Sequence, residues 1–231
     1  MLVLLDIDGT LLHGAPRAHT EALTLAMQDV HGVPAGPGDV AAVRPAGRTD
    51  QEIARLVLRA HGVGDAAITR AMPAWMLRAA ELYPALDAVH PEPRVAAAAA
   101  ESLGRVARAG ASLALLTGNL EPIARAKMDR AGLGGWFPAG GGAFGSDHES
   151  RDALVPIALG RAGCGAGDGD GRDVVVVVGD TPRDIACARA GRARCVAVAT
   201  GSYAAGDLAG ADAVAADLAG AAHVLEEWLT V

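Results

Sequence analysis

The segment LVLLDIDGTLL at residues 2–12 constrains the fold more than any other part of the chain. Its short apolar run is typical of a central strand in a parallel sheet, where helices cover both faces. Two acids, Asp6 and Asp8, end this run, and a glycine and a threonine follow directly. Because a buried carboxylate is costly unless it is paired, two of them at the end of a buried strand indicate a functional sheet edge.

Two later segments repeat this design. In ASLALLTGN an apolar run ends at Thr117, Gly118 and Asn119, and in VVVVVGDTPRD five valines lead to Asp180 and Asp184. In parallel sheets, ligands bind at the carboxyl ends of the strands. If the three strands lie side by side, we expect their polar ends to converge on one site.

Strands and helices alternate along most of the chain. Further strands are predicted at RCVAVATG and DAVAADL, and helices are predicted over residues 95–110, 121–131, 151–162 and 219–229. A helix from Pro182 follows the valine run, because proline suits a first helical turn. This alternation predicts an α/β fold with a parallel sheet and right-handed crossovers.

Residues 14–90 differ in pattern from the rest and contain no clear strand. Apolar residues recur at helical spacing up to Gly32, and PAGPGDVAAVRPAGR then has the composition of a loop. The next helix has Thr49 or Asp50 as its N-cap, and one or two more helices follow with a break near Pro73. We therefore predict a small helical insert, with the α/β core formed by residues 1–13 and 91–231.

Composition excludes several classes of protein. A net charge of −7 and the absence of a basic cluster argue against nucleic-acid binding. No stretch reaches the ~18 apolar residues that a membrane span requires, and the opening MLVLL is too short for a signal peptide. The three scattered cysteines are typical of reduced thiols, so we expect a cytoplasmic protein. The acids in GCGAGDGDGRD do not have the spacing of an EF-hand loop. Nothing in the sequence indicates the oligomeric state.

Carboxylates gathered at a strand end suit one kind of chemistry. Hard oxygen ligands favour Mg²⁺, which removes the repulsion between the acids and attracts phosphate oxygens. One carboxylate can then attack phosphorus, and a second can protonate the leaving oxygen and later activate water. A hydroxyl, backbone N–H groups and a basic side chain can hold the phosphoryl oxygens.

The motifs DIDGT, LLTGN and GDTPRD, in this order, resemble motifs one, two and four of the haloacid dehalogenase superfamily of hydrolases. The resemblance spans the chain. Within the superfamily the chain looks most like the phosphoglycolate-phosphatase-like branch, which has a small helical cap. It implies a Rossmann-like parallel-sheet core with residues 14–90 as an inserted all-helical cap domain. It further implies a Mg²⁺-dependent phosphatase that hydrolyses a small phosphorylated metabolite through an aspartyl-phosphate intermediate.

The resemblance also implies roles for the acids. Asp6 corresponds to the nucleophile, which also binds the metal. Asp8 corresponds to the general acid/base, with its backbone carbonyl on Mg²⁺. Asp180 corresponds to a metal ligand that Asp184 supports. True dehalogenases of this superfamily usually lack an acid at the position of Asp8, so its presence favours phosphoryl transfer.

The phosphate-binding residues follow in the same way. Thr117 and the backbone around Gly118 and Asn119 correspond to the phosphate-binding turn. The third motif needs a basic residue, usually lysine, for which Arg151 and Lys127 are candidates. We favour Arg151 because it begins a helix, whereas Lys127 lies about six residues into its helix, ~9 Å from the start of that helix.

Substrate specificity is assigned to the cap. Arg44 and Arg48, in a loop before the Thr49 helix, are candidate substrate-binding residues. His13 and Arg17 lie near the expected hinge, and a solvent-facing turn is their alternative interpretation.

Two other functions stay open. A phosphomutase would use the same Asp6, and a non-catalytic binding protein on this fold is a less favoured alternative. A phosphonate hydrolase would need a lysine in the cap, but Lys127 is the only lysine of the chain and lies outside the cap.

Overall fold

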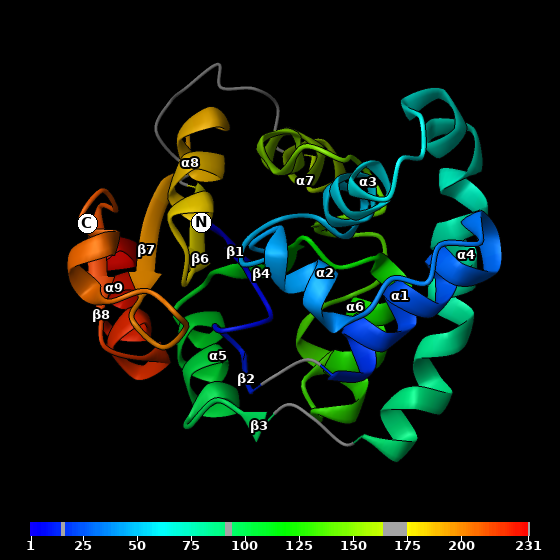
Figure 1. Ribbon diagram of the computed structural model, residues 1–231. Coiled ribbons are helices and arrows are strands. Elements are labelled where there is room, and N and C mark those ends of the chain that lie inside the picture. Colours follow the sequence, from blue (N-terminus) through cyan, green and yellow to red (C-terminus); the bar gives the residue numbers. More distant parts are fainter. Residues whose placement is uncertain (15–16, 91–93, 164–174, 231) are drawn as a thin grey trace.

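The computed structural model describes residues 1–14, 17–90, 94–163 and 175–230 (Figure 1). Its main sheet has six parallel strands in the order β5-β4-β1-β6-β7-β8. The strands in chain order are β1 Leu2–Leu5, β4 Ser112–Thr117, β5 Ala143–Phe144, β6 Val175–Gly179, β7 Arg194–Val198 and β8 Ala213–Ala215. The predicted parallel α/β core is therefore confirmed, and the three motif-bearing strands β4, β1 and β6 are neighbours.

Helices cover both faces of this sheet, which explains the continuous apolar runs. Val3 and Leu5 of β1 face one core, whereas Leu2 and Leu4 face the other. The first core is completed by helices α5 Ala99–Arg108, α6 Glu121–Arg130 and α9 Leu218–Thr230. The second is completed by α7 Leu154–Arg161 and α8 Pro182–Ala190. Short 3₁₀ helices lie at Gly134–Trp136, Arg151–Ala153 and Ala205–Leu208.

The insert is an all-helical cap beside this sheet, at the right of Figure 1. Its helices are α1 Arg17–His31, α2 Pro37–Ala42, α3 Asp50–Ala60 and α4 Asp65–Val89. They enclose an apolar core that includes Leu23, Met27, Leu58 and Trp75, and Leu120 and Ile123 of the sheet domain pack into it. Where the chain leaves and re-enters the sheet domain, β2 Leu12–His13 pairs antiparallel with β3 Arg94–Val95. Domain boundaries after residues 13 and 90 stay a prediction that this pairing supports.

The structure departs from the predicted elements in three places. The helix over residues 65–89 continues without interruption through Pro73 and Pro84, so the predicted break near Pro73 is wrong. Its buried residues, among them Trp75, contribute packing that offsets the ~3 kcal/mol cost of an interior proline. The expected loop contains α2, which Pro37 begins and Asp39 caps by accepting from the Gly36 N–H at 2.8 Å. The short strands β2 and β3 were also not predicted.

The cysteines and the helices of the described residues bear on two predictions, that of reduced thiols and that of no membrane span. Cys187 and Cys195 are buried free thiols, which fits the reduced state expected of them. None of the helices in the described ranges has the length and hydropathy that crossing a membrane requires. The GCGAGDGDGRD segment lies outside the described residues, and the cytoplasmic location stays a prediction.

Candidate active site

Three neighbouring strands deliver their polar ends to one place. In the parallel register Leu5 of β1 lies opposite Leu115 of β4 and Val178 of β6, so the chains that follow emerge together. The Asp6 N–H still donates to the Val178 carbonyl at 2.9 Å, which fixes the first acid at the strand end. The convergence expected from the sequence is present in the structure.

Asp6, Asp180 and Asp184 form a buried cluster at this edge. One carboxylate oxygen from each lies within 4.8 Å of the others, and all three residues are buried. Three negative groups this close repel one another unless cations offset their charge. The cluster therefore requires a positive partner, whether a side chain or a metal ion.

Arg151 supplies part of that charge from the 3₁₀ turn before α7. Its Nη2 lies 3.3 Å from Oδ1 of Asp6 and also donates to Oδ1 of Asp184. The side chain is 5 % exposed, and its Nε has no hydrogen-bond partner among the described residues. Burial lowers the pKa of Arg151, but Asp184 and Asp6 outweigh burial and raise it, so the guanidinium stays charged. An unpartnered buried N–H is costly, which makes this group a ready donor to a bound anion.

The three acids differ in how many of their oxygens are already engaged. Asp184 accepts from the N–H and the hydroxyl of Thr181 at 2.9 and 2.7 Å, in addition to Arg151. Asp180 accepts one long bond, 3.3 Å, from the Thr10 hydroxyl. Asp6 and Asp180 therefore keep more free lone pairs for a cation than Asp184 does.

Burial and mutual repulsion raise the pKa values of two acids in this cluster. Burial raises the pKa of Asp6 to about 6, against the opposing charge of Arg151 and with the help of Asp184 and Asp8. Burial likewise raises the pKa of Asp180 to about 8, and the nearby Asp6 and Asp184 add to it. Carboxylates in this state bind a divalent cation favourably, because the cation removes the cost of their ionisation.

Asp8 has a separate environment, one residue beyond the cluster. Lys127 donates to both of its carboxylate oxygens at 2.8 and 2.6 Å, and Asn119 Nδ2 donates to Oδ2 at 2.8 Å. Burial raises the pKa of Asp8, but Lys127, His19 and the hydrogen bonds outweigh it and hold the pKa below its ordinary value. The pKa values of the two strand-end acids are thus driven in opposite directions, toward the protonated form for Asp6 and the ionised form for Asp8. A cation bound beside Asp6 would favour the ionised form that a nucleophile needs.

The turn after β4 is packed tightly against the cap. Thr117 Oγ1 accepts from the N–H and the Nδ2 of Asn119 at 3.3 and 3.1 Å, and its hydroxyl proton remains free to donate. A Cβ on Gly118 would lie 2.0 Å from the carbonyl oxygen of Arg48, so only glycine fits beneath the cap loop. The Gly118 carbonyl accepts from the Asp50 N–H at 2.8 Å.

A cavity of about 480 Å³ lies between the two domains. Asp6, Asp8, Asn119, Arg151 and Asp180 line it from the core. The cap contributes a wall that includes His19, Thr20, Leu23, Val40, Arg48, Asp50 and Ile53. The acids of the core thus face a small space that the cap covers.

The two candidate substrate-binding arginines of the cap differ in position. Arg48 lines the cavity, and its guanidinium is held by Glu52 and by the Val43 carbonyl at 3.0 Å. Arg44 is not among the described residues that line the cavity. His13, at the hinge, lines it and has a buried Nδ1 without a partner among the described residues, which favours the site over the solvent-facing turn.

Lys127 is the main correction to the sequence-based site. Its place in the second turn of α6 was expected to carry it away from the strand ends, but its Nζ lies 2.6 Å from Asp8. The long side chain returns along the helix toward its N-terminus, which is the usual direction for side chains on a helix. Lys127 and Arg151 therefore both reach the site, but they bind different acids.

Sequence reasoning missed three residues at this site. His19 of α1 and Asp50 of α3 reach the core from the cap, and Thr10 binds Asp180. A histidine on the buried face of α1, beside Ala22 and Leu23, is a signal that could have identified His19. Asp50 was considered only as a helix cap, a role that Thr49 performs by accepting from the Glu52 N–H at 3.1 Å.

Comparisons with known proteins agree with this geometry. A family model described as a hydrolase, haloacid dehalogenase-like hydrolase, matches residues 1–192. A search of curated proteins found no match to the sequence.

Solved structures share the fold over nearly the whole chain. A hydrolase from Pseudomonas syringae has a TM-score of 0.67 and 20 % identity, with 98 % of each chain covered. CbbY from Rhodobacter sphaeroides in complex with phosphate has a TM-score of 0.66 and 23 % identity, with 94 % of each chain covered. A predicted phosphoglycolate phosphatase from Haemophilus somnus 129pt has a TM-score of 0.63 and 15 % identity, with 96 % of each covered.

Proposed function

The chain belongs to the haloacid dehalogenase-like hydrolases, and we propose that it is a Mg²⁺-dependent phosphatase for a small phosphorylated metabolite. One observation carries the proposal. Asp6 lies at the floor of a capped cavity, within 3.3 Å of the Arg151 guanidinium and beside Asp180 and Asp184. This arrangement gives a nucleophile, a fixed cation and a set of metal-binding oxygens in one small space.

The proposed reaction has two steps. An Asp6 oxygen attacks phosphorus while the bond from phosphorus to the leaving oxygen breaks, and Asp8 gives its proton to that oxygen. The products are an alcohol and an aspartyl phosphate on Asp6. Asp8 then takes a proton from water, the water oxygen attacks phosphorus, and Asp6 and inorganic phosphate are released.

Arg151 and the turn after β4 hold the phosphoryl oxygens in this proposal. The Arg151 Nε is buried and unpartnered, so a phosphoryl oxygen would satisfy it with a charge-assisted hydrogen bond. The Thr117 hydroxyl and the N–H groups around Gly118 and Asn119 are the further donors. Arginine keeps its charge at every working pH, so it replaces the lysine usual at this position of the family.

The donor set fits Mg²⁺. Asp6 and Asp180 would offer hard oxygens to the ion, and the Asp8 backbone carbonyl would add another. Asp184 would support them, because its own oxygens are largely engaged by Thr181 and Arg151. When bound, Mg²⁺ supplies positive charge that offsets the carboxylates and the phosphoryl oxygens together. The raised pKa values of Asp6 and Asp180 support a cation at this place.

The size of the cavity supports a small substrate. About 480 Å³ is in the usual range of small-molecule sites, so the cavity accommodates a phosphate with a leaving group of metabolite size, and Arg48 is a cap residue that lines it. The CbbY structure with the same fold contains phosphate, and another structure of this fold is described as a predicted phosphoglycolate phosphatase. Both support a phosphorylated metabolite as substrate.

The test is phosphate release from a panel of phosphorylated metabolites and from 4-nitrophenyl phosphate, with Mg²⁺ present. We expect the wild-type protein to release phosphate and the Asp6→Asn variant, folded by circular dichroism, to release none above background. An isomerised product without free phosphate would instead establish a phosphomutase. Activity of Asp6→Asn equal to wild type would exclude Asp6 as nucleophile, and no turnover of any substrate would favour a binding protein.

A further inference from the structure

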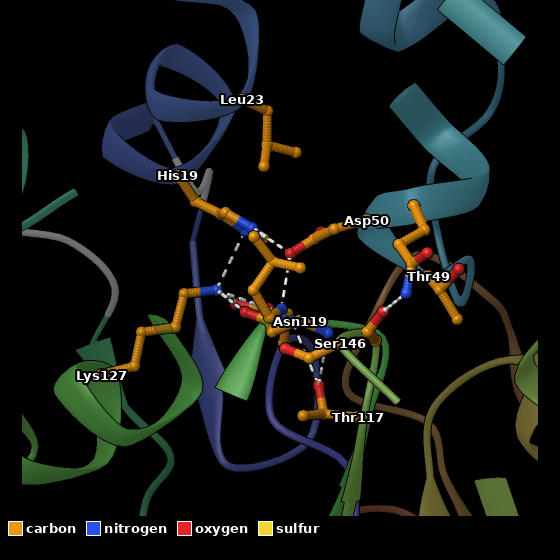
Figure 2. Close-up of polar contacts among 12 residues, drawn as sticks. His19, Leu23, Thr49, Asp50, Thr117, Asn119, Lys127 and Ser146 are labelled. Carbon is orange, nitrogen blue, oxygen red and sulfur yellow. Dashed lines mark hydrogen bonds and ion pairs between the residues drawn. The ribbon is translucent and has the colours of Figure 1, made fainter. Parts of the chain in front are cut away.

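Lys127 is the most unusual basic residue of the molecule. It lies in α6 of the core with its side chain 1 % exposed, and it is the only lysine in the chain. Its ammonium has three N–H donors and three partner residues: Asp8, Asn119 Oδ1 at 2.5 Å and His19 Nδ1 at 3.2 Å (Figure 2). Every donor is used, so the position of Lys127 is fixed by groups from both domains.

His19 continues this chain of contacts into the cap. Its Nε2 lies 2.9 Å from Oδ2 of Asp50, a residue at the start of cap helix α3. The tautomer with its proton on Nε2 satisfies both contacts, because Nδ1 then accepts from the ammonium and Nε2 donates to the carboxylate. With this tautomer both ring nitrogens of His19 have a hydrogen-bond partner.

Asp50 closes the connection back onto the core. The same Oδ2 accepts from the Leu120 N–H at 2.8 Å, at the start of α6, and the Asp50 N–H donates to the Gly118 carbonyl at 2.8 Å. In Figure 2 dashed lines join Lys127 to His19 and His19 to Asp50, around the turn that contains Thr117 and Asn119. These hydrogen bonds form only while the cap rests on the core.

We propose that Lys127 is a positioning residue for Asp8 and that His19 and Asp50 make its hold on Asp8 depend on closure of the cap. The inference rests on the proposed function, in which Asp8 moves a proton to and from the reacting oxygens. The Asp8 side chain is 31 % exposed toward the cavity, so without Lys127 only Asn119, among the residues that the structure describes, directs its carboxylate. Asp8 is thus aligned with the leaving group when the cap covers the substrate.

The structure contains a natural control for this proposal. Arg130, three residues after Lys127 on the same helix, bridges to Asp87 of cap helix α4 at 2.7 Å. This pair also joins core and cap, but neither residue contacts Asp8. Loss of Arg130 therefore weakens cap closure for both substrates alike, whereas Lys127 and His19 still hold Asp8 in every complex that closes.

A matched pair of substrates separates positioning of Asp8 from general damage. 4-Nitrophenyl phosphate has a leaving group that departs as a stable anion, whereas 4-nitrobenzyl phosphate, of nearly the same size, releases an alkoxide that must be protonated. The measurement is kcat/KM for each, which reports steps up to departure of the leaving group. Values are taken on the plateau of each variant's pH profile, so that changes in the protonation of Asp8 do not enter.

We expect Lys127→Met to lower kcat/KM for the benzyl ester roughly 10- to 100-fold more than for the phenyl ester, because a misplaced acid fails only where a proton is needed. His19→Ala should shift the same ratio in the same direction by a smaller factor. In the double variant the two effects should be less than additive, because both act on one contact. Arg130→Met should leave the ratio at its wild-type value.

Equal losses for the two esters in Lys127→Met and His19→Ala would overturn the inference and leave Lys127 a structural residue. If circular dichroism shows that Lys127→Met is unfolded, the test rests on His19→Ala and Arg130→Met. The ratio of kcat/KM for the two esters should then change in His19→Ala and not in Arg130→Met. A wild-type protein that hydrolyses neither ester would contradict the proposed function instead. The two failures are therefore distinguishable.

Discussion

Arg151 and Lys127 are two buried cations that bind two different acids, and this difference predicts different consequences of their loss. Arg151 contacts Asp6 and Asp184, where phosphorus would react, whereas Lys127 contacts Asp8, which serves the leaving group. With 4-nitrophenyl phosphate the leaving group needs no proton. We expect Arg151→Ala to lower kcat/KM about 100-fold or more, as does removal of one donor to transition-state charge.

Lys127→Ala should lower kcat/KM for the same substrate by a much smaller factor. Arg151→Lys should recover part of the activity, because a lysine offers the charge without the planar fork of donors. A larger loss in Lys127→Ala than in Arg151→Ala would assign the third-motif role to Lys127. Steady-state kinetics of the three variants decides between these results.

For single residues, the sequence predicts the position of some site residues well and of others poorly. Asp6 and Asp180 could be predicted because each directly follows an apolar strand, and parallel strands end at the same edge. Lys127 and His19 could not be placed, because each lies inside a helix and its direction depends on how that helix packs. The contact between them joins residues 108 positions apart on two domains, which no local pattern encodes.

Among the structural elements, the turn after β4 sets how closely the cap can approach. Because a Cβ on Gly118 would lie 2.0 Å from the Arg48 carbonyl, Gly118→Ala forces the cap loop away from the strand ends. We expect this variant to lose activity about tenfold or more, since misplaced groups around a reacting centre are costly. Melting temperature and kcat/KM with 4-nitrophenyl phosphate measure the two consequences.

Gly160→Ala is the matched control for that substitution. Gly160 lies in the last turn of helix α7, and a Cβ there meets nothing within 4 Å. Alanine should stabilise the helix by about 0.5–1 kcal/mol and leave kcat/KM unchanged. Urea unfolding gives the first value. A Gly118→Ala variant as active as Gly160→Ala would show that the cap does not close in the way described.

The elements themselves were predictable where periodicity and capping agreed. Helix α3 has its expected N-cap at Thr49, and the strands at the valine run and at the two later apolar segments are present. Helix α4 was missed as one unit because proline's local preference was weighed without the packing that overrides it. Strands β2 and β3 are two residues each, too short for any alternation to be seen.

For the whole molecule, the acidic cluster links stability to pH and to metal. Asp6 and Asp180 have pKa values raised from 3.8 to about 6 and about 8, with Asp184 and Arg151 facing both. A carboxyl with a raised pKa favours folding in its protonated form. Its contribution is complete below 3.8 and is lost as the pH rises through the folded-state values.

We therefore expect the melting temperature of metal-free protein to fall as the pH rises from about 4 to about 8, with several kcal/mol of stability lost at roughly 1.4 kcal/mol per pKa unit. Mg²⁺ should raise the melting temperature most at the upper end of this range, because it binds the ionised carboxylates. Calorimetry with EDTA or Mg²⁺ measures both effects. Asp180→Asn should flatten both responses, and equal pH and Mg²⁺ responses in this variant and wild type would contradict the assignment.

The arrangement of the two domains shows where sequence reasoning ends. The parallel sheet and the helical cap follow from alternating apolar runs and from a long segment without strands. The cavity between them depends on contacts such as Asp50 with the turn at Gly118, which join segments far apart in the chain. The class of substrate follows from the acids, but the leaving group is recognised by cap residues whose positions only the packed structure provides.

The central claim is that Asp6 takes the phosphoryl group. Its most direct measurement is peptide mapping by mass spectrometry of the Asp8→Asn variant, acid-quenched while it turns over 4-nitrophenyl phosphate with Mg²⁺. This substrate lets the first step proceed without a proton, and loss of Asp8 slows the attack of water, so the phosphoenzyme should accumulate. We predict a phosphate on the peptide that contains Asp6 and on no other. Phosphate on another residue, or steady release of 4-nitrophenol without any phosphoenzyme, would contradict the account.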